Sequence, residues 1–314
     1  MSTVATGQWL NQFVAPQLLQ EFKNFKDDFI AVLKGVPTAA LTADGVRWNK
    51  LINNVNFYVN NSNEFTPQRM TGEKFFVEWE KYDTDPTAVD DAEIRYLAYN
   101  KRNEVRVRHS DAMKLGIRDH VMWKLAPADS TNANMPVIRT TGEDDGTGRL
   151  RLTFKDIVMY LETVKRLNLK NMNELYMILC PEHVTDLILD NNSARFFSDK
   201  QIFFDMESGK VRSIMGFKFF ENNAVLAYDS TGAKKPKGAV LGATDRVASL
   251  MFAAEETVYH IESVKILYSP ETQDTRNADP TSEFRLQTYG LVDRRRDYGF
   301  GAVISGIAET TDEP

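Results

Sequence analysis

One stretch of the sequence, from Asp90 to Ala126, has the pattern of a single long helix. Asp90 and Asp91 are placed to cap its first turn, where the helix dipole favours negative charge. Pro127 ends it, because proline disfavours helical dihedrals in the residue before it. At 1.5 Å per residue the helix would be about 50 Å long, so we expect a structural spine or a helix lying across a flat molecule. Its apolar stripe is Leu97, Val105, Ala112, Leu115, Met122 and Ala126.

The middle of this stretch is positively charged. Residues 99–124 hold seven lysines or arginines and three acids, which gives +4 within a chain whose net charge is −6. A solvated helix face explains this charge, and so does a face that meets a polyanion. The residues assigned to the basic face are Arg102, Arg106, Arg108, Lys114 and Arg118.

Composition limits the class of protein. At 314 residues and 42% hydrophobic residues, the chain can form one or two domains with real cores. Its acidic balance argues against a protein that coats nucleic acid non-specifically. The single cysteine, Cys180, allows no intrachain disulfide and no cysteine-rich metal site. No apolar run approaches the roughly 18 residues of a membrane span, and we expect a soluble protein made in a reducing compartment.

Residues 1–53 are predicted to form an N-terminal arm. Apolar residues between Pro16 and Leu33 share one face of a predicted helix, which Gly35 and Pro37 end. This helix could pack on the chain's own core or reach onto a neighbouring subunit. The first is the simpler interpretation.

Residues 54–89 are predicted to form an extended β-hairpin. Apolar and polar residues alternate over 55–59 and again over 75–79, which is the pattern of strands, and the polar tip between them contains Pro67. A two-stranded hairpin is marginally stable alone in water, and no local helix supports it. We therefore expect Phe75, Val77 and Trp79 to rest on an adjacent subunit, so that Trp79→Asp would prevent assembly but leave a folded monomer.

The rest of the chain has mixed patterns. Residues 128–256 alternate helices and strands, which indicates an α/β unit: Thr153 begins a capping box, residues 175–180 form an apolar run, and Pro181 opens a helix. Residues 257–308 are strand-rich. Residues 309–314 form an acidic tail that we expect to be disordered.

No constellation of residues points to catalysis. The four histidines are scattered, Cys180 sits in an apolar run, and the acidic loop at 143–145 lacks the spacing of a calcium site. We therefore expect no catalytic residue, no cofactor and no metal. The densest basic cluster, Arg294, Arg295 and Arg296 beside Asp293 and Asp297, is predicted to form ion pairs, with contact to DNA as the alternative.

The hairpin and the segment YDTDPTAVDDAEIRYLAYNKRNEVRVRHSDAMKLGIRDHVMWKLAP, from Tyr82 to Pro127, resemble the major capsid proteins of tailed double-stranded-DNA bacteriophages. This resemblance implies an α+β fold shared with encapsulins and the herpesvirus capsid floor. Its parts would be an arm (1–53), an extended loop (54–89), a spine helix of the peripheral domain (90–127), an α/β axial domain (128–256) and C-terminal strands of the peripheral domain (257–308).

The resemblance also implies a function. The chain would assemble with itself into hexamers and pentamers of an icosahedral shell around phage DNA, with part of the basic helix face turned inward. Portal, scaffolding and decoration proteins would be partners, and the chain would belong to the virion after assembly in the host cytoplasm. Some relatives weld subunits through a hairpin lysine, for which Lys74 and Lys81 are the candidates here.

Two alternatives remain at this point. An encapsulin, a cellular nanocompartment of the same fold, would need a cargo-binding pocket and particles without DNA. A soluble α/β enzyme or binding module would explain the composition, but it leaves the hairpin and the long helix without a purpose.

Overall fold

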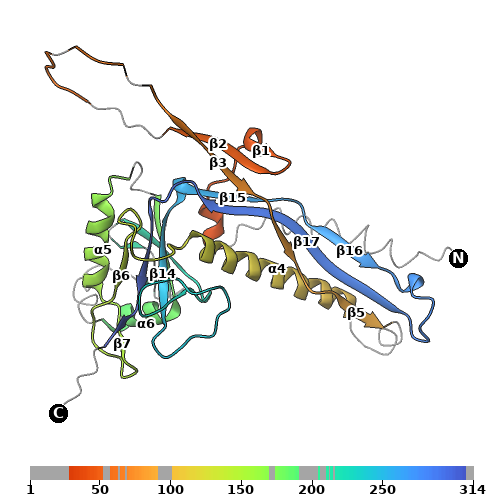
Figure 1. Ribbon diagram of the computed structural model, residues 1–314. Coiled ribbons are helices and arrows are strands. Elements are labelled where there is room, and N and C mark those ends of the chain that lie inside the picture. The colour runs from red at the N-terminus through yellow and green to blue at the C-terminus, as the bar shows by residue number, and fades with distance from the viewer. Residues whose placement is uncertain are drawn as a thin grey trace.

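The computed structural model describes residues 28–51, 57–62, 64–67, 69–90, 101–169, 174–190, 204–205, 210–211, 213–214 and 216–308. Within this part of the chain, the predicted α+β class is confirmed. One long helix, α4 (Lys101–Leu125), runs along an elongated β-sheet; a second β-sheet lies near the C-terminal end of this helix, and a hairpin projects away from both sheets (Figure 1). We call the shorter, helix-covered unit the α/β lobe and the other the elongated lobe.

The α/β lobe is built on a seven-stranded sheet. Its main path runs β11-β12-β8-β14-β18-β6, and β13 pairs with β14. Most of the pairs are antiparallel, but β12 runs parallel to β8 and β18 parallel to β6. The strands are β6 (Val137–Arg139), β8 (Leu175–Leu179), β11 (Ser213–Ile214), β12 (Phe217–Glu221), β13 (Ala227–Tyr228), β14 (Arg246–Ala253) and β18 (Phe300–Ile304).

Both faces of this sheet are buried. Along β8, Tyr176 and Ile178 join the core that contains α4 residues, whereas Leu175 and Met177 join the core formed with α5 (Phe154–Arg166) and α6 (Pro181–Leu189). A strand covered on both faces needs apolar residues at every position, which is why residues 175–180 read as one continuous apolar run.

The helices that cover this sheet begin where the sequence predicts. The Thr153 hydroxyl accepts a hydrogen bond from the Asp156 backbone N–H, and the Asp156 carboxylate accepts one from the Thr153 backbone N–H, so the predicted capping box of α5 is confirmed. Pro181 occupies the first turn of α6, also as predicted, because its missing N–H needs no partner there.

The elongated lobe is organised around β17 (Thr281–Arg294), the longest described strand. One edge of β17 pairs with β15 (Thr257–Ile261) and β16 (Lys265–Ser269). The other edge pairs with β4 (Glu80–Asp83) and β5 (Thr87–Asp90). Helix α4 packs along β17, so this strand connects every other element of the lobe.

Asp90 ends β5 and pairs with Thr281, and α4 is described from Lys101. The predicted first turn of the helix falls on residues 91–100, which lie outside the described part. One expectation about this lobe is corrected. Strand β18 does not complete the sheet beside α4. It pairs with β14 and β6 in the other lobe, because Phe300 and Ala302 fit the core there.

The C-terminus of α4 ends just before Pro127 and is capped by cations from two distant segments. Lys234 Nζ donates to the carbonyls of Trp123 (2.8 Å) and Ala126 (2.9 Å), and Arg294 also donates to Ala126. Positive charge is favourable there because the helix dipole is negative at this end. Burial lowers the pKa of Lys234 to about 8.

The described part of the N-terminal arm packs on the chain's own core. Phe29, in the short 3-10 helix Asp28–Val32, is fully buried, and its ring meets that of Phe252 edge-on at 6.3 Å. The remainder of the predicted arm helix and the predicted acidic tail lie outside the described residues. The smaller elements are Thr38–Ala40, β7 (Arg149–Leu150), β9 (Phe204–Asp205), β10 (Lys210–Val211), Ala254–Glu256, Glu271–Gln273 and β19 (Gly306–Ile307).

Candidate functional site: the hairpin and its junction

The projecting hairpin consists of β2 (Gly45–Leu51) and β3 (Gly72–Glu78), with β1 (Leu41–Thr42) along the outer edge of β2. Its first strand therefore lies about ten residues earlier than predicted, and residues 57–60 belong to the tip. The reason is packing: Val46 pairs with Val77, and both side chains are buried. The alternation in the sequence GVRWNKL could have revealed this strand.

The base of the hairpin rests on its own chain. Val46 and Val77 form a buried cluster with Val258 of β15 and Leu291 of β17. Phe75 and Trp79 pack against the same cluster from its edge. The predicted contact face Phe75, Val77 and Trp79 thus already has an apolar support within the chain. That support comes from residues about 180 or more positions away, which a local search of the sequence does not see.

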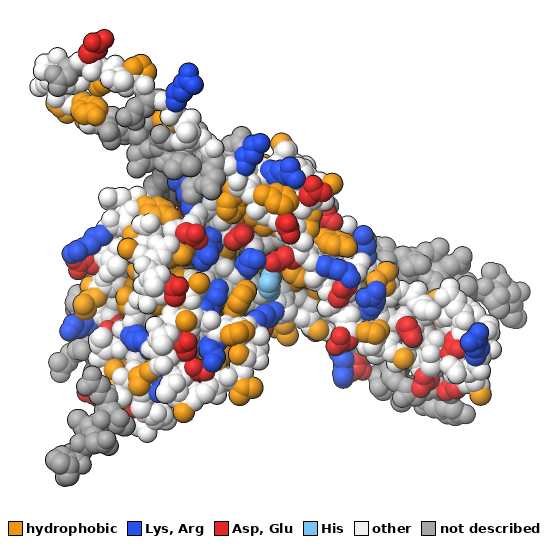
Figure 2. Space-filling view, viewed as in Figure 1, with side chains coloured by type: hydrophobic (Ala, Val, Ile, Leu, Met, Phe, Trp, Pro, Cys, Tyr) orange, Lys and Arg blue, Asp and Glu red, His pale blue; other side chains and the backbone are white. Residues whose placement is uncertain are grey.

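The tip of the hairpin carries apolar side chains in solvent. Phe57 is 90% exposed and Val59 is 72% exposed, and both lie far from either lobe (Figures 1 and 2). The rings of Tyr58 and Phe65 meet edge-on at 5.7 Å across the tip. An exposed apolar cluster of this kind marks an interaction site in a soluble protein.

The hairpin joins the elongated lobe at two consecutive residues. Trp79 Nε1 donates to the Thr42 carbonyl at 3.1 Å, and this hydrogen bond attaches Trp79 to strand β1 beside the hairpin. Glu80 begins β4 and binds helix α4: its carboxylate is 2.6 Å from His120 Nε2 and accepts from Lys124 Nζ at 2.9 Å. Burial alone would raise the pKa of Glu80, but His120 and Lys124 outweigh it and lower the pKa to about 2.

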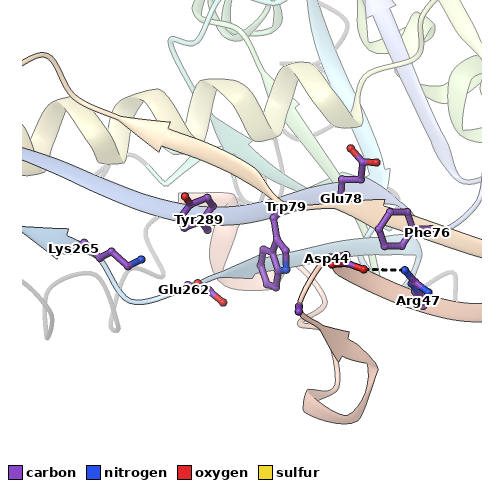
Figure 3. A pocket seen from close by; sticks show the side chains of 9 residues that line it. Asp44, Arg47, Phe76, Glu78, Trp79, Glu262, Lys265 and Tyr289 are labelled. Carbon is purple, nitrogen blue, oxygen red and sulfur yellow. Dashed lines mark hydrogen bonds and ion pairs between the residues drawn. The ribbon is translucent and has the colours of Figure 1, made fainter.

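An open pocket of about 620 Å³ lies at this junction (Figure 3). One wall comes from the hairpin and the turn before β2, and the other comes from β16, β17 and the loop after β15; Trp79 lies between them. It combines three aromatic rings with five charged side chains. The lining residues are Ala43, Asp44, Arg47, Phe76, Glu78, Trp79, Glu262, Lys265 and Tyr289.

The predicted basic residues of α4 are spread around the helix. At 3.6 residues per turn, Arg108 lies about 200° and Arg118 about 120° from Arg106, so these three share no face. Arg106 is buried, Arg118 donates to Asn223 at 3.0 Å, and Lys114 is half-buried. Arg108 is exposed beside Glu104 at 2.5 Å. The side chain of Arg102 is outside the described part.

The arginine cluster after β17 makes ion pairs within the chain. Arg294 lies 3.2 Å from Asp297, and Arg296 lies 3.8 Å from Glu256. Arg295 is exposed, and its backbone N–H donates to the Glu256 carbonyl. Burial raises the pKa of Asp293, whose carboxylate accepts from the Arg294 backbone.

Two polar groups of the α/β lobe, built around buried His183 and buried Asp186, had no signal in the sequence. His183 is fully buried and bonded to the hydroxyls of Ser249 (2.7 Å) and Ser305 (2.9 Å). Arg149 makes two hydrogen bonds to Asp186, at 2.7 and 2.8 Å. Cys180 is buried, which raises its pKa to about 11 and leaves it a poor nucleophile.

No three histidine, cysteine, aspartate or glutamate side chains in the described part of the chain are grouped so as to hold a metal ion. None of its helices is long and apolar enough to cross a membrane.

The fold is similar to that of phage capsid proteins. The capsid structure of cyanophage Pam1 matches with a TM-score of 0.64 at 9% identity, over 88% of this chain and 89% of that one. The capsid of cyanophage P-SCSP1u gives 0.62 at 10% identity, over 88% and 87%. A structure from Mycobacterium phage Che8 gives 0.60 at 14% identity, over 88% and 90%. The predicted capsid-protein fold is thereby confirmed.

Sequence comparisons add nothing to this likeness. No protein-family model matches the chain, and no curated protein matches it. At identities this low, the similarity concerns the fold.

Proposed function

We propose that this chain is a shell subunit that assembles with itself into an icosahedral capsid of hexamers and pentamers around the double-stranded DNA of a tailed phage. The supporting observation is the likeness of fold to the capsids of two cyanophages and to a structure from a Mycobacterium phage, which extends over nearly nine tenths of both chains in each case. In this proposal the elongated lobe with α4 is the peripheral domain, the α/β lobe is the axial domain, and the hairpin is the extended loop.

The role of such a subunit is geometric and requires no catalysis or cofactor. Many weak contacts that each copy makes with several neighbours act together, as multivalent binding does. The chain would be part of the virion after assembly in the host cytoplasm, and portal, scaffolding and decoration proteins would be its further partners.

The hairpin tip is the intersubunit contact that the exposed side chains favour. Phe57, Val59 and Phe65 are each more than 60% exposed, whereas Val77 is buried in its own chain. Burying one large apolar side chain contributes roughly 1.5–3 kcal/mol, so a tip seated on a second copy would add substantially to each contact. The apolar face of β3 then packs within its own chain, at the base of the hairpin, and does not contact the neighbouring copy.

Contact with packaged DNA is proposed for α4. Of the cations assigned to its basic face, Arg108 has the most exposed described side chain, at 77%. Arg106 is buried and Arg118 is hydrogen-bonded to Asn223, so both are less accessible to DNA than Arg108.

Particle size tests the proposal. The expressed chain should elute as megadalton particles that negative-stain images show as closed shells, and a species that stays near 35.8 kDa would contradict it. Particles that never contain DNA, even from infected cells, would favour the encapsulin alternative. Denaturing gels of assembled shells test a covalent weld through Lys74 or Lys81, since a single monomer band excludes it.

A further inference from the structure

We propose that the pocket at the hairpin junction binds an arginine side chain of a second copy of this chain, and that this contact fixes the angle of the hairpin on its own body. The inference rests on the proposed function, because it assumes that copies of the chain assemble. Assembly alone requires neither the arginine ligand, nor its binding site in the pocket, nor the fixed angle of the hairpin.

The pocket is built from two units, the hairpin and the elongated sheet. Arg47 and Phe76 belong to the hairpin, whereas Lys265 and Tyr289 belong to the elongated sheet, and Trp79 lies where the two meet (Figure 3). A group bound in the pocket therefore touches both units at once.

The pocket already uses the chemistry that recognises cations. The Arg47 guanidinium lies 4.8 Å from the centre of the Phe76 ring, and Lys265 Nζ lies 5.3 Å from the centre of the Tyr289 ring. Trp79 is the third ring, and indole is the best of the aromatic acceptors for a cation. No described cation lies over it; its edge meets the ring of His260 at 5.6 Å.

One carboxylate of the pocket is left for a ligand. Three carboxylates and two cations line the pocket. Asp44 and Arg47 pair with each other at 3.2 Å, whereas Glu262 has no ion-pair partner among the described residues. Figure 3 shows Glu78 pointing away from Trp79, on the opposite side of the strand, so Glu262 is the carboxylate that we assign to the ligand.

The geometry points to arginine rather than lysine. A guanidinium is flat, stacks on an aromatic face and presents a fork of N–H donors to a carboxylate, whereas an ammonium is a compact, strongly hydrated charge. Trp79 and Glu262 offer the two partners that a guanidinium can use together. In the proposed shell, a second copy is the partner present beside every pocket.

Occupation of the pocket has a mechanical consequence. The hairpin is held at its base by one small apolar cluster and by the Trp79 contact to Thr42. An arginine between Trp79 and Glu262 adds a bridge from the junction to the loop after β15. Docking of a neighbour therefore sets the direction in which the hairpin tip points.

Two matched variants test the site. Glu262→Gln should lower the yield of particles by about tenfold, the effect of weakening one charge-assisted pair at each contact, and should leave the thermal unfolding of the unassembled chain unchanged. Glu283→Gln makes the same change of charge at an exposed position of β17 that does not line the pocket, and it should leave the yield unchanged. Normal particles from Glu262→Gln, or an equal loss from both variants, would overturn the proposal.

A second measurement follows the carboxylate directly. Carbodiimide labelling with glycine ethyl ester, read by mass spectrometry, should modify Glu262 readily in the unassembled chain and at least several-fold less in particles. Equal labelling in both states would overturn the proposal. So would protection of the unassembled chain by spermidine alone, because the site would then hold a free polyamine.

These outcomes are distinct from failure of the proposed function. If the wild-type chain never forms particles, the shell itself is wrong. If wild-type shells form and Glu262→Gln forms them equally well, only the arginine site is wrong.

Discussion

Glu80 Oε2 and His120 Nε2 lie 2.6 Å apart, and this contact joins the residue after the hairpin to the last third of α4. The same carboxylate accepts from Lys124 and from the Tyr82 hydroxyl. One side chain thus ties together the hairpin junction, β4 and the helix. These bonds fasten β4, the strand that follows the hairpin, to the helix.

Replacing Glu80 with glutamine should lower the free energy of unfolding by about 1.5–3 kcal/mol at pH 7, the range for hydrogen bonds to charged groups. The pKa of Glu80 falls from 4.5 to about 2 on folding, so its contribution is present above pH 4.5 and is lost as the pH falls toward 2. Urea unfolding at pH 7 and pH 3 measures both effects. Glu78→Gln is the control, and an equal loss from it would contradict the assignment.

His183 should make the α/β lobe sensitive to acid. Burial between Ser249 and Ser305 lowers its pKa from 6.5 to about 4, so the folded state binds fewer protons than the unfolded state between these values. Stability should therefore fall as the pH drops below 6.5 and level off below 4, by about 3 kcal/mol in total.

The variant His183→Gln isolates this contribution, since the amide keeps a donor and an acceptor but does not titrate. The stability advantage of the wild-type chain over the variant should shrink between pH 7 and pH 4 in urea unfolding. If the difference in stability between the wild-type chain and the variant is independent of pH, His183 is not the cause of the acid sensitivity.

Gly45→Ala should loosen the base of the hairpin. A β-carbon at this position would lie 2.0 Å from the Val77 carbonyl oxygen, so the backbone of β2 or β3 must shift. We expect a loss of about 1–3 kcal/mol and faster hydrogen exchange at the β2 and β3 amides. Gly35→Ala, where an added β-carbon meets nothing within 4 Å, should leave exchange in these strands unchanged.

The hairpin tip and the hairpin base should respond differently to an acidic substitution. Phe57→Asp should abolish particles and leave monomer stability within about 0.5 kcal/mol, because surface substitutions away from packed groups are usually neutral. Trp79→Asp should also lower monomer stability, since Trp79 packs on the Val46–Val77 cluster and bonds to Thr42. Sizing and thermal unfolding together separate the two, and normal shells from Phe57→Asp would contradict the role of the tip.

The sequence predicted those parts of the fold that depend on neighbours along the chain. The capping box at Thr153, the helix opened by Pro181 and the buried strand over residues 175–179 are all confirmed, since each depends on local hydrogen bonds or on burial of every residue in a run. The resemblance to capsid proteins added the overall fold, which no pattern in a single segment could have supplied.

The errors concern pairings between distant segments. Residues 55–59 and 45–51 both alternate, and only the burial of Val46 against Val258 and Leu291 selects the second as a hairpin strand. The prediction that β18 completes the sheet beside α4 was wrong for the same reason: an apolar strand could be buried in either lobe, and only its distant partners select the α/β lobe. The pocket at Trp79 brings together residues 43 to 289, and no local pattern in the sequence could reveal it.

Among the described elements from α4 onward, the chain passes between the two lobes three times: from α4 to β6, from β14 to β15, and from β17 to β18. The three crossings meet at one place, because Arg294 donates to the Ala126 carbonyl and the Arg295 backbone donates to the Glu256 carbonyl. A protease that cuts any one of them would leave the lobes connected through the other two. Such a nicked molecule would run as two bands on a denaturing gel and still behave as a single body in solution.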